Sequence, residues 1–133
     1  MRCGVTEMFI FDTSAWVEYF IGSSRGAKVR DILESQEKIA TPIIVLIELS
    51  CKASKEGVDF TSNVDFIRQK STIIGIGVDD VESVGKTYAK MRKINGKTSL
   101  PDAVVATAAK DNGATIVTCD RDFIGVENVN LIS

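Results

Sequence analysis

Histidine is absent from this chain of 133 residues. Its absence excludes Ser-His-Asp and Cys-His catalysis, zinc sites that contain histidine, and the commonest general base. Cysteine is scarce: Cys3, Cys51 and Cys119 are odd in number and widely spaced, so they indicate neither a disulfide framework nor a zinc site. Cys51 and Cys119 have apolar neighbours, and we expect both in the core. Any catalysis must therefore rely on carboxylates, lysines, hydroxyls or a metal ion.

Long hydrophobic runs are missing as well. No stretch approaches the ~20 apolar residues that a membrane-spanning helix needs. Asp12 and Glu18 interrupt the apolar N-terminal run, which therefore does not match a secretory signal peptide, and we expect a cytoplasmic protein. With 44% hydrophobic and 26% charged residues, the chain has the composition of one globular domain over residues 1–133. Residues 1–7 are expected to form a loose tail, and Met8 is an alternative start.

Short apolar segments alternate with patterns that are typical of helices. Strands are expected at residues 8–12, 38–41, 72–76 and 115–119, with a weaker one at 129–132. Helices are expected to begin near residues 13, 25, 42, 61, 79 and 102. This alternation predicts an α/β fold with three layers, α/β/α, around a central and mostly parallel sheet of four or five strands.

Acidic residues follow two of the expected strands. Asp12 ends the first strand, Asp120 ends the strand at 115–119, and Asp122 is two residues further on. Sites in parallel sheets form beyond the carboxyl ends of the strands, beside the point where the strand order reverses. If these two strands are neighbours, Asp12 and Asp120 face the same crevice.

Two further acids are expected on helices. Glu48 lies within the apolar run 43–49, where an unpaired buried carboxylate is costly, and Asp102 follows Pro101 at the start of an Ala/Val-rich helix. If both helices pass over the crevice, four carboxylates meet there and repel one another unless a cation lies between them. Mg²⁺ and Mn²⁺ prefer such oxygen ligands. The pattern predicts an enzyme that cleaves phosphodiester bonds with one or two of these ions.

Each acid also has a purely structural interpretation. Asp12 suits a helix N-cap, and Asp102 suits the first turn of a helix. Asp120 and Asp122 suit a turn, and Glu48 suits a salt bridge to a lysine or arginine. The combination of acids at two strand ends and on two helices carries the functional prediction.

Hydroxyl and basic residues accompany the acids. Thr13, Ser14 and Thr118 flank them, where a hydroxyl either orients a water or a carboxylate or caps an element. The densest basic region lies between residues 86 and 97, and it is either a solvated helix face or a phosphate-binding surface. The candidate nucleic-acid contacts are Lys90, Arg92, Lys93 and Arg121. The net charge is −2, although without the five acids the remaining charge is mildly basic.

Four motifs carry a family resemblance: Phe11-Asp12-Thr13-Ser14-Ala15-Trp16, Ile47-Glu48-Leu49, Leu100-Pro101-Asp102-Ala103 and Thr118-Cys119-Asp120-Arg121-Asp122-Phe123. With them the chain from 8 to 133 resembles the PIN-domain nucleases, and more narrowly the small VapC-type toxins of prokaryotic toxin–antitoxin pairs. The resemblance implies endonucleolytic attack on RNA that depends on Mg²⁺ or Mn²⁺. It also implies a homodimer and a small antitoxin that blocks the site.

The resemblance and the spacing agree on the site. The catalytic and metal-binding set is Asp12, Glu48, Asp102 and Asp120. The auxiliary set is Asp122, Ser14, Thr118 and Thr13. Three alternatives remain open: an RNA-processing PIN nuclease without an antitoxin, a receiver-like signalling domain, and a non-catalytic module that binds RNA or protein. A receiver-like domain requires two adjacent acids after the first strand, but this chain has only Asp12 there.

Overall fold

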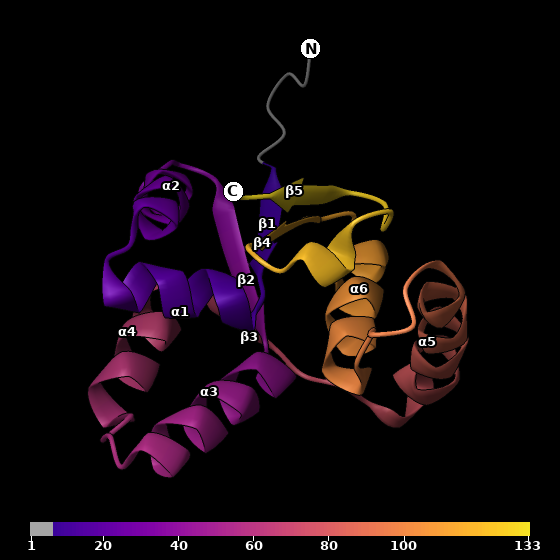
Figure 1. Ribbon diagram of the computed structural model, residues 1–133, viewed down its shortest axis with the longest axis horizontal. Helices are drawn as coiled ribbons and strands as arrows, with labels where there is room; N and C mark the ends of the chain where they lie inside the picture. The colour runs from indigo at the N-terminus through magenta and orange to yellow at the C-terminus, as the bar shows by residue number, and fades with distance from the viewer. Residues whose placement is uncertain (1–6) are drawn as a thin grey trace.

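One parallel sheet organises the protein, whose computed structural model describes residues 7–133 (Figure 1). The strands run in the order β3-β2-β1-β4-β5, and each neighbouring pair is parallel. Their bounds are β1 (Met8–Phe11), β2 (Lys38–Pro42), β3 (Thr72–Ile74), β4 (Thr115–Thr118) and β5 (Val129–Leu131). The predicted parallel sheet is therefore confirmed, with five strands. The expected N-terminal tail lies almost wholly outside the described residues.

Helices cover both faces of this sheet. They are α1 (Thr13–Ile21), α2 (Ser24–Leu33), α3 (Ile43–Glu56), α4 (Thr61–Lys70), α5 (Val81–Ile94) and α6 (Leu100–Asn112). Short 3₁₀ turns, η1 (Val78–Asp80) and η2 (Arg121–Phe123), join the remaining segments. Figure 1 shows α1, α2 and α4 on one side of the sheet and α5 and α6 on the other, while α3 contacts both α1 and α6. The three-layer prediction is confirmed, and none of the described helices is long and apolar enough to cross a membrane.

The core is centred on β1 and β4. Ile10, Phe11, Ile116 and Val117 are almost completely buried, as expected for central strands that are covered on both faces. Cys119, directly after β4, is buried as predicted. Cys51 is exposed, so the prediction for it is wrong. The buried positions of α3 are Val45, Leu46 and Leu49. Cys51 is two residues after Leu49, about 200° further around the helix, and therefore lies on the opposite, exposed face.

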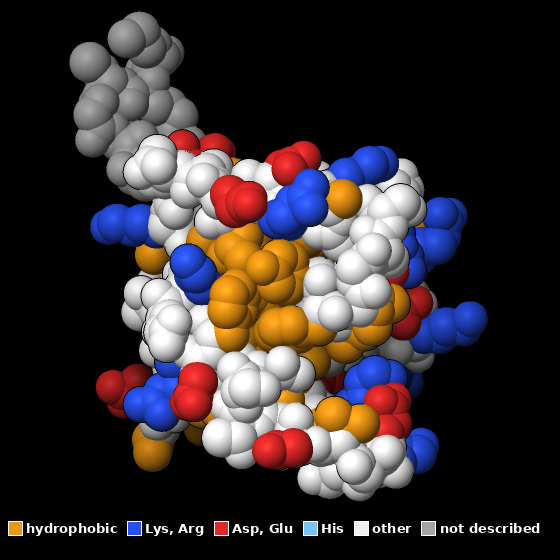
Figure 2. All heavy atoms as spheres, turned by 90° about the vertical axis from the view of Figure 1, so that its left-hand side faces the viewer, with side chains coloured by type: hydrophobic (Ala, Val, Ile, Leu, Met, Phe, Trp, Pro, Cys, Tyr) orange, Lys and Arg blue, Asp and Glu red, His pale blue; other side chains and the backbone are white. Residues whose placement is uncertain are grey.

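An aromatic cluster joins α1 to α4. Trp16 is fully buried, and its ring lies 5.8 Å from that of Phe20 and 6.4 Å from that of Phe66. The Trp16 indole N–H donates to the hydroxyl of Thr41 in β2, at 3.1 Å. Apolar side chains gather at the centre of the face that Figure 2 presents, which is the side of the molecule where α1, α2 and α4 lie.

Candidate functional site

The strand order reverses between β1 and β4, because the chain passes from β1 to β2 on one side and β4 lies on the other. Phe11 is paired with Val117, and the backbone N–H of Asp12 donates to the carbonyl of Val117 at 3.2 Å. Asp12 and Asp120 therefore follow neighbouring parallel strands at the same edge of the sheet. This is the position at which open α/β sheets bind ligands.

A cleft of about 370 Å³ opens at this edge. The helices that carry Glu48 and Asp102 pass over it, as the prediction required. All five acids singled out in the sequence line the cleft: Asp12, Glu48, Asp102, Asp120 and Asp122. Within the part of the chain that the structure describes, no lysine or arginine forms an ion pair with any of them. The salt-bridge interpretation of Glu48 is therefore not what the described residues show.

Asp12 is the most buried of these acids, with 5% of its surface exposed. Its Oδ1 accepts hydrogen bonds from the Ser14 hydroxyl at 2.8 Å and from the Ala15 N–H at 2.9 Å, so it also caps α1. Its Oδ2 accepts from the Thr118 hydroxyl at 2.5 Å. Burial and, to a smaller extent, the charge of Asp120 raise the pKa of Asp12 to about 6, even though these three bonds favour the charged form.

Two hydroxyls tie this carboxylate to the end of β4. The Ser14 hydroxyl accepts from the backbone N–H of Cys119 at 2.8 Å, and the Thr118 hydroxyl accepts from that of Asp120 at 2.9 Å. The two hydroxyl oxygens are 3.2 Å apart. The predicted flanking hydroxyls thus connect the Asp12 carboxylate to the segment that carries Asp120.

Glu48 enters the cleft from α3. The Thr13 hydroxyl donates to its Oε1 at 2.6 Å. Burial raises the pKa of Glu48, and the negative charges of Asp102 and Asp120 raise it further, while the bond from Thr13 opposes both effects. Among the described residues the other carboxylate oxygen of Glu48 has no donor, so it is available to a ligand in the cleft.

The remaining three acids form a tight group. Carboxylate oxygens of Asp102, Asp120 and Asp122 all lie within 4.8 Å of one another. Asp102 completes a capping box at the start of α6, where its Oδ2 accepts from the Ser99 N–H at 3.0 Å. Partial burial raises its pKa, and the charges of Asp120 and Asp122 add to that effect. Like charges at this spacing repel one another, and either protonation or a cation between them relieves the repulsion.

The donor set fits a hard divalent cation. Every acidic ligand atom in the cleft is a carboxylate oxygen, as such cations prefer. The acids are buried or half-buried and form no direct ion pair with a lysine or arginine among residues 7–133, so no described salt bridge neutralises them. Capping and metal binding are compatible for the same acids, because a carboxylate has about four acceptor sites and even Asp12 uses only three of them.

Sequence reasoning missed several residues that line the cleft or contact its acids. Asn95, at the end of α5, donates from Nδ2 to Oδ1 of Asp122 at 3.2 Å. Ser99 had a recognisable signal, since Ser-x-x-Asp is typical of a capping box. The other charged residues that were missed are Glu18, Arg25 and Lys52, whereas Lys97 belongs to the basic region that the sequence analysis placed between residues 86 and 97.

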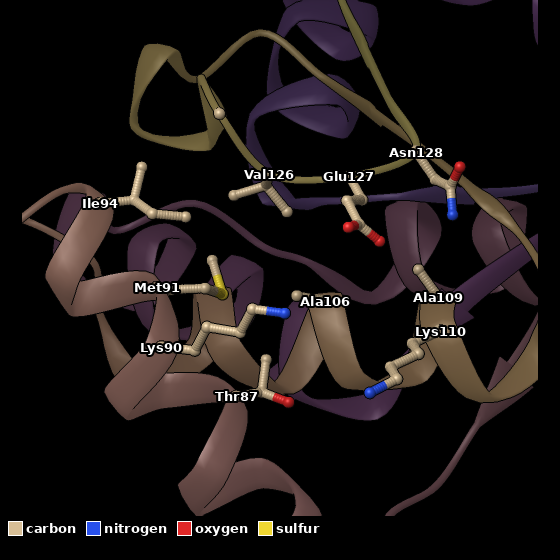
Figure 3. A pocket seen from close by; sticks show the side chains of 11 residues that line it. Thr87, Lys90, Met91, Ile94, Ala106, Ala109, Lys110, Val126, Glu127 and Asn128 are labelled. Atoms are coloured by element: carbon tan, nitrogen blue, oxygen red, sulfur yellow. The ribbon is translucent and has the colours of Figure 1, made fainter.

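The basic residues predicted to bind nucleic acid do not line the cleft. Lys90 lies in a separate hollow of about 180 Å³ between α5, α6 and the segment before β5 (Figure 3). Arg92 donates from Nη1 to the carbonyl of Thr98 at 3.0 Å, and Lys93 and Arg121 are exposed. Contact of these four residues with nucleic acid stays a prediction.

Comparison with known proteins identifies the family. A family model described as PIN domain matches residues 9–129. The chain is 30% identical over 123 residues to the VapC ribonuclease Mb1587 of Mycobacterium bovis and to ribonuclease VapC11 of Mycobacterium tuberculosis, and covers 89% of each. These alignments include 87% of the present chain.

Solved structures agree on the fold. VapC20 from M. tuberculosis, described as a Sarcin-Ricin loop cleaving toxin, superposes with a TM-score of 0.72 at 17% identity, over 94% of this chain and 99% of that one. VapBC2 from Rickettsia felis, bound to a DNA fragment of its promoter, gives a TM-score of 0.72 at 22% identity, over 93% and 96%. The chain therefore belongs to the PIN domain family, with the VapC ribonucleases among its relatives.

Proposed function

We propose that this protein is a metal-dependent endoribonuclease that hydrolyses RNA phosphodiester bonds and acts as the toxin of a toxin–antitoxin pair. One observation carries the proposal: five carboxylates meet at the β1–β4 junction, and none of them forms an ion pair with a lysine or arginine among the described residues. Curated relatives at 30% identity that are named ribonucleases support the choice of RNA. We take residues 1–133 as one nuclease domain that works in the cytoplasm.

The acids divide into ligands and supporting groups. Asp12, Glu48, Asp102 and Asp120 would hold one or two Mg²⁺ or Mn²⁺ ions, and Asp122 is auxiliary. When bound, such an ion lowers the pKa of water and stabilises the negative charge that develops on the phosphate. This supplies the function for which other hydrolases use histidine, which the chain lacks.

The protein's own contribution is to hold the carboxylates in place. Thr118 and Ser14 fix the two oxygens of Asp12, and Thr13 fixes one oxygen of Glu48. These hydroxyls favour the charged carboxylates against the cost of burial. The carboxylates are thus held in place before a metal binds, and a cation in the cleft would supply the remaining stabilisation of their charge.

A protein partner also has a plausible surface. An apolar groove of about 190 Å³ between α1, α3 and α4 shares Val17 and Lys52 with the acidic cleft, and Phe20 and Phe60 line it. A segment of an antitoxin seated in this groove would extend over the cleft and exclude RNA. Structures described as VapBC complexes support such a partner, and a homodimer is part of the same proposal.

The experiment compares the wild type with Asp12→Asn on a labelled single-stranded RNA. The wild type is expected to cut internally with Mg²⁺ or Mn²⁺ and to stop when EDTA is added, and the variant is expected to be inactive. Calorimetry with Mn²⁺ is the second measurement. A wild type that neither binds Mn²⁺ nor cuts RNA would favour the non-catalytic module, and equal cutting by both proteins would indicate a different site.

A further inference from the structure

Three cations line the acidic cleft, and the proposed metal chemistry does not use them. They are Arg25 in α2, Lys52 in α3 and Lys97 in the α5–α6 connection. We infer that these residues, the cationic rim, bind RNA phosphates next to the bond that is cut, with Arg25 as the principal contact. The inference rests on the proposed function, because it names how the same cleft holds its substrate.

Arg25 is held in a fixed orientation. Its Nε donates to Oε1 of Glu18 at 3.1 Å, and its Nη2 lies 3.0 Å from the same oxygen. Its Nη1 donates to the carbonyl of Cys119 at 3.2 Å. A guanidinium has five N–H groups, so these contacts leave two unused. An arginine with a fixed plane and free donors is well suited to a phosphate.

The backbone sets this position as firmly as the side chains do. A Cβ atom added to Gly26 would lie 2.0 Å from the carbonyl oxygen of Glu18, so α1 and α2 approach more closely than any other residue would allow. Glu18 is mostly buried, with 13% of its side chain exposed, whereas the side chain of Arg25 is 41% exposed. Glu18 is therefore the buried member of the pair, and the guanidinium of Arg25 is exposed to the cleft.

Each cation of the rim lies near an acid of the candidate metal site. The carbonyl that Arg25 contacts belongs to Cys119, the residue before Asp120. Lys52 is one helical turn after Glu48 on α3, and Lys97 precedes the helix that carries Asp102. An RNA strand whose phosphate reaches the acids thus meets positive charge from three separate elements. Phosphate contacts of this kind provide most of the sequence-independent affinity for nucleic acid.

Binding is measured in the inactive Asp12→Asn background, by fluorescence anisotropy of a labelled single-stranded RNA over a range of salt concentrations. Arg25→Gln, Lys52→Gln and Lys97→Gln are each expected to weaken binding and to reduce the slope of log K against log salt by about 0.7. Lys86→Gln is the matched control for Lys52→Gln. Lys86 pairs with Glu82 at 3.1 Å and Lys52 pairs with Glu56 at 3.2 Å, both at a spacing of four residues, but only Lys52 lines the cleft.

Arg25 requires a further test, because a variant at this position also loses the contact with the carbonyl of Cys119, the residue before Asp120. Arg30, exposed on the same helix, provides the control Arg30→Gln. In an otherwise wild-type enzyme, Arg25→Gln is expected to raise KM with a smaller effect on kcat and to leave Mn²⁺ affinity unchanged, while Arg25→Lys restores part of the salt slope. A loss of Mn²⁺ affinity with an unchanged salt slope would assign Arg25 a structural role and overturn the inference.

The two proposals fail in different ways. If the wild type cuts RNA and the rim variants keep its KM and salt slope, the inference that the cationic rim binds RNA is wrong, and the proposed nuclease function is unaffected. If the wild type neither cuts nor binds RNA, the proposed function fails, and the rim fails with it.

Discussion

The Thr118 hydroxyl donates a 2.5 Å hydrogen bond to Oδ2 of Asp12, although the two residues are 106 positions apart in the chain. Thr118 ends β4 and Asp12 follows β1, so the bond crosses the junction at which the strand order reverses. It holds the most buried acid of the cleft through a neighbouring strand. The precision of the site therefore depends on the register of the sheet.

Thr118→Val tests this connection, because valine preserves the shape of threonine and removes the hydroxyl. Loss of a group that orients a metal ligand typically costs 10–100-fold in metal affinity or activity, and we expect a decrease in that range. Mn²⁺ calorimetry and RNA cleavage are the measurements. Thr107→Val is the control, since Thr107 is equally buried but donates only to the Ala103 carbonyl within α6. Equal effects of both substitutions would contradict the assigned connection.

The pH dependence of stability reports on Asp12. In the metal-free protein the folded-state pKa of about 6 exceeds the ordinary value of 3.8, so folding favours the protonated carboxyl. This contribution is fully present below pH 3.8 and is lost as the pH rises through 6. It amounts to about 3 kcal/mol, at about 1.4 kcal/mol per pKa unit.

Asp12→Asn removes that contribution. The raised pKa values of Glu48 and Asp102 act in the same direction and remain in both proteins. We therefore expect the wild type to lose stability relative to the variant between about pH 4 and 6, as measured by urea denaturation in EDTA. If the free energy of unfolding changes with pH in the same way for both proteins, Asp12 has an ordinary pKa and the prediction is wrong.

The sequence was sufficient to place two acids of the site at one edge of the sheet, while the structure supplied the strand order that makes them neighbours. Asp12 and Asp120 end buried strands of a parallel sheet, and this alone places them at one edge. Glu48 was identifiable because a carboxylate within the apolar run 43–49 requires an explanation. Asp102 followed from a helix start that the capping residue Ser99 marks.

The missed residues are those that depend on side chains meeting from distant elements. Arg25 contacts the carbonyl of Cys119, 94 residues away, and no local pattern encodes this contact. Of the basic region between residues 86 and 97, only Lys97 lines the cleft among the residues that the structure describes, because most of the region lies on α5, which does not border the cleft. Cys51 was misplaced for a related reason: apolar neighbours in sequence do not determine which way a helical residue faces.

Asn95→Ala is expected to lower the affinity for Mn²⁺, although Asn95 is not a proposed metal ligand. The amide of Asn95 donates to Oδ1 of Asp122, and its own Oδ1 accepts from the N–H of Lys97 at 2.9 Å. Without the amide, the carboxylate of Asp122 loses a hydrogen-bond donor that orients it, and the backbone N–H of Lys97 loses its acceptor. We expect Mn²⁺ affinity to fall less than in Asp120→Asn, by calorimetry. An unchanged affinity would show that Asp122 lies outside the metal site.

Asp102→Asn is expected to have opposite effects on the metal-free and metal-loaded protein. Asparagine still offers an oxygen to the Ser99 N–H, so the capping box at the start of α6 is preserved. It also removes one of three negative charges that lie within 4.8 Å of one another. The metal-free variant should therefore unfold at a higher temperature than the metal-free wild type.

In saturating Mn²⁺ the order of stability should reverse. A ligand that binds only the folded state stabilises it by about 2.7 kcal/mol at one hundred times its Kd, and the variant should lose most of this gain because it has lost a ligand. Thermal unfolding with and without Mn²⁺ measures both states. Asp111→Asn is a suitable control, because Asp111 is exposed at the other end of α6. If Asp102→Asn keeps the full Mn²⁺ stabilisation, Asp102 serves only as a helix cap and the metal is held by the remaining acids.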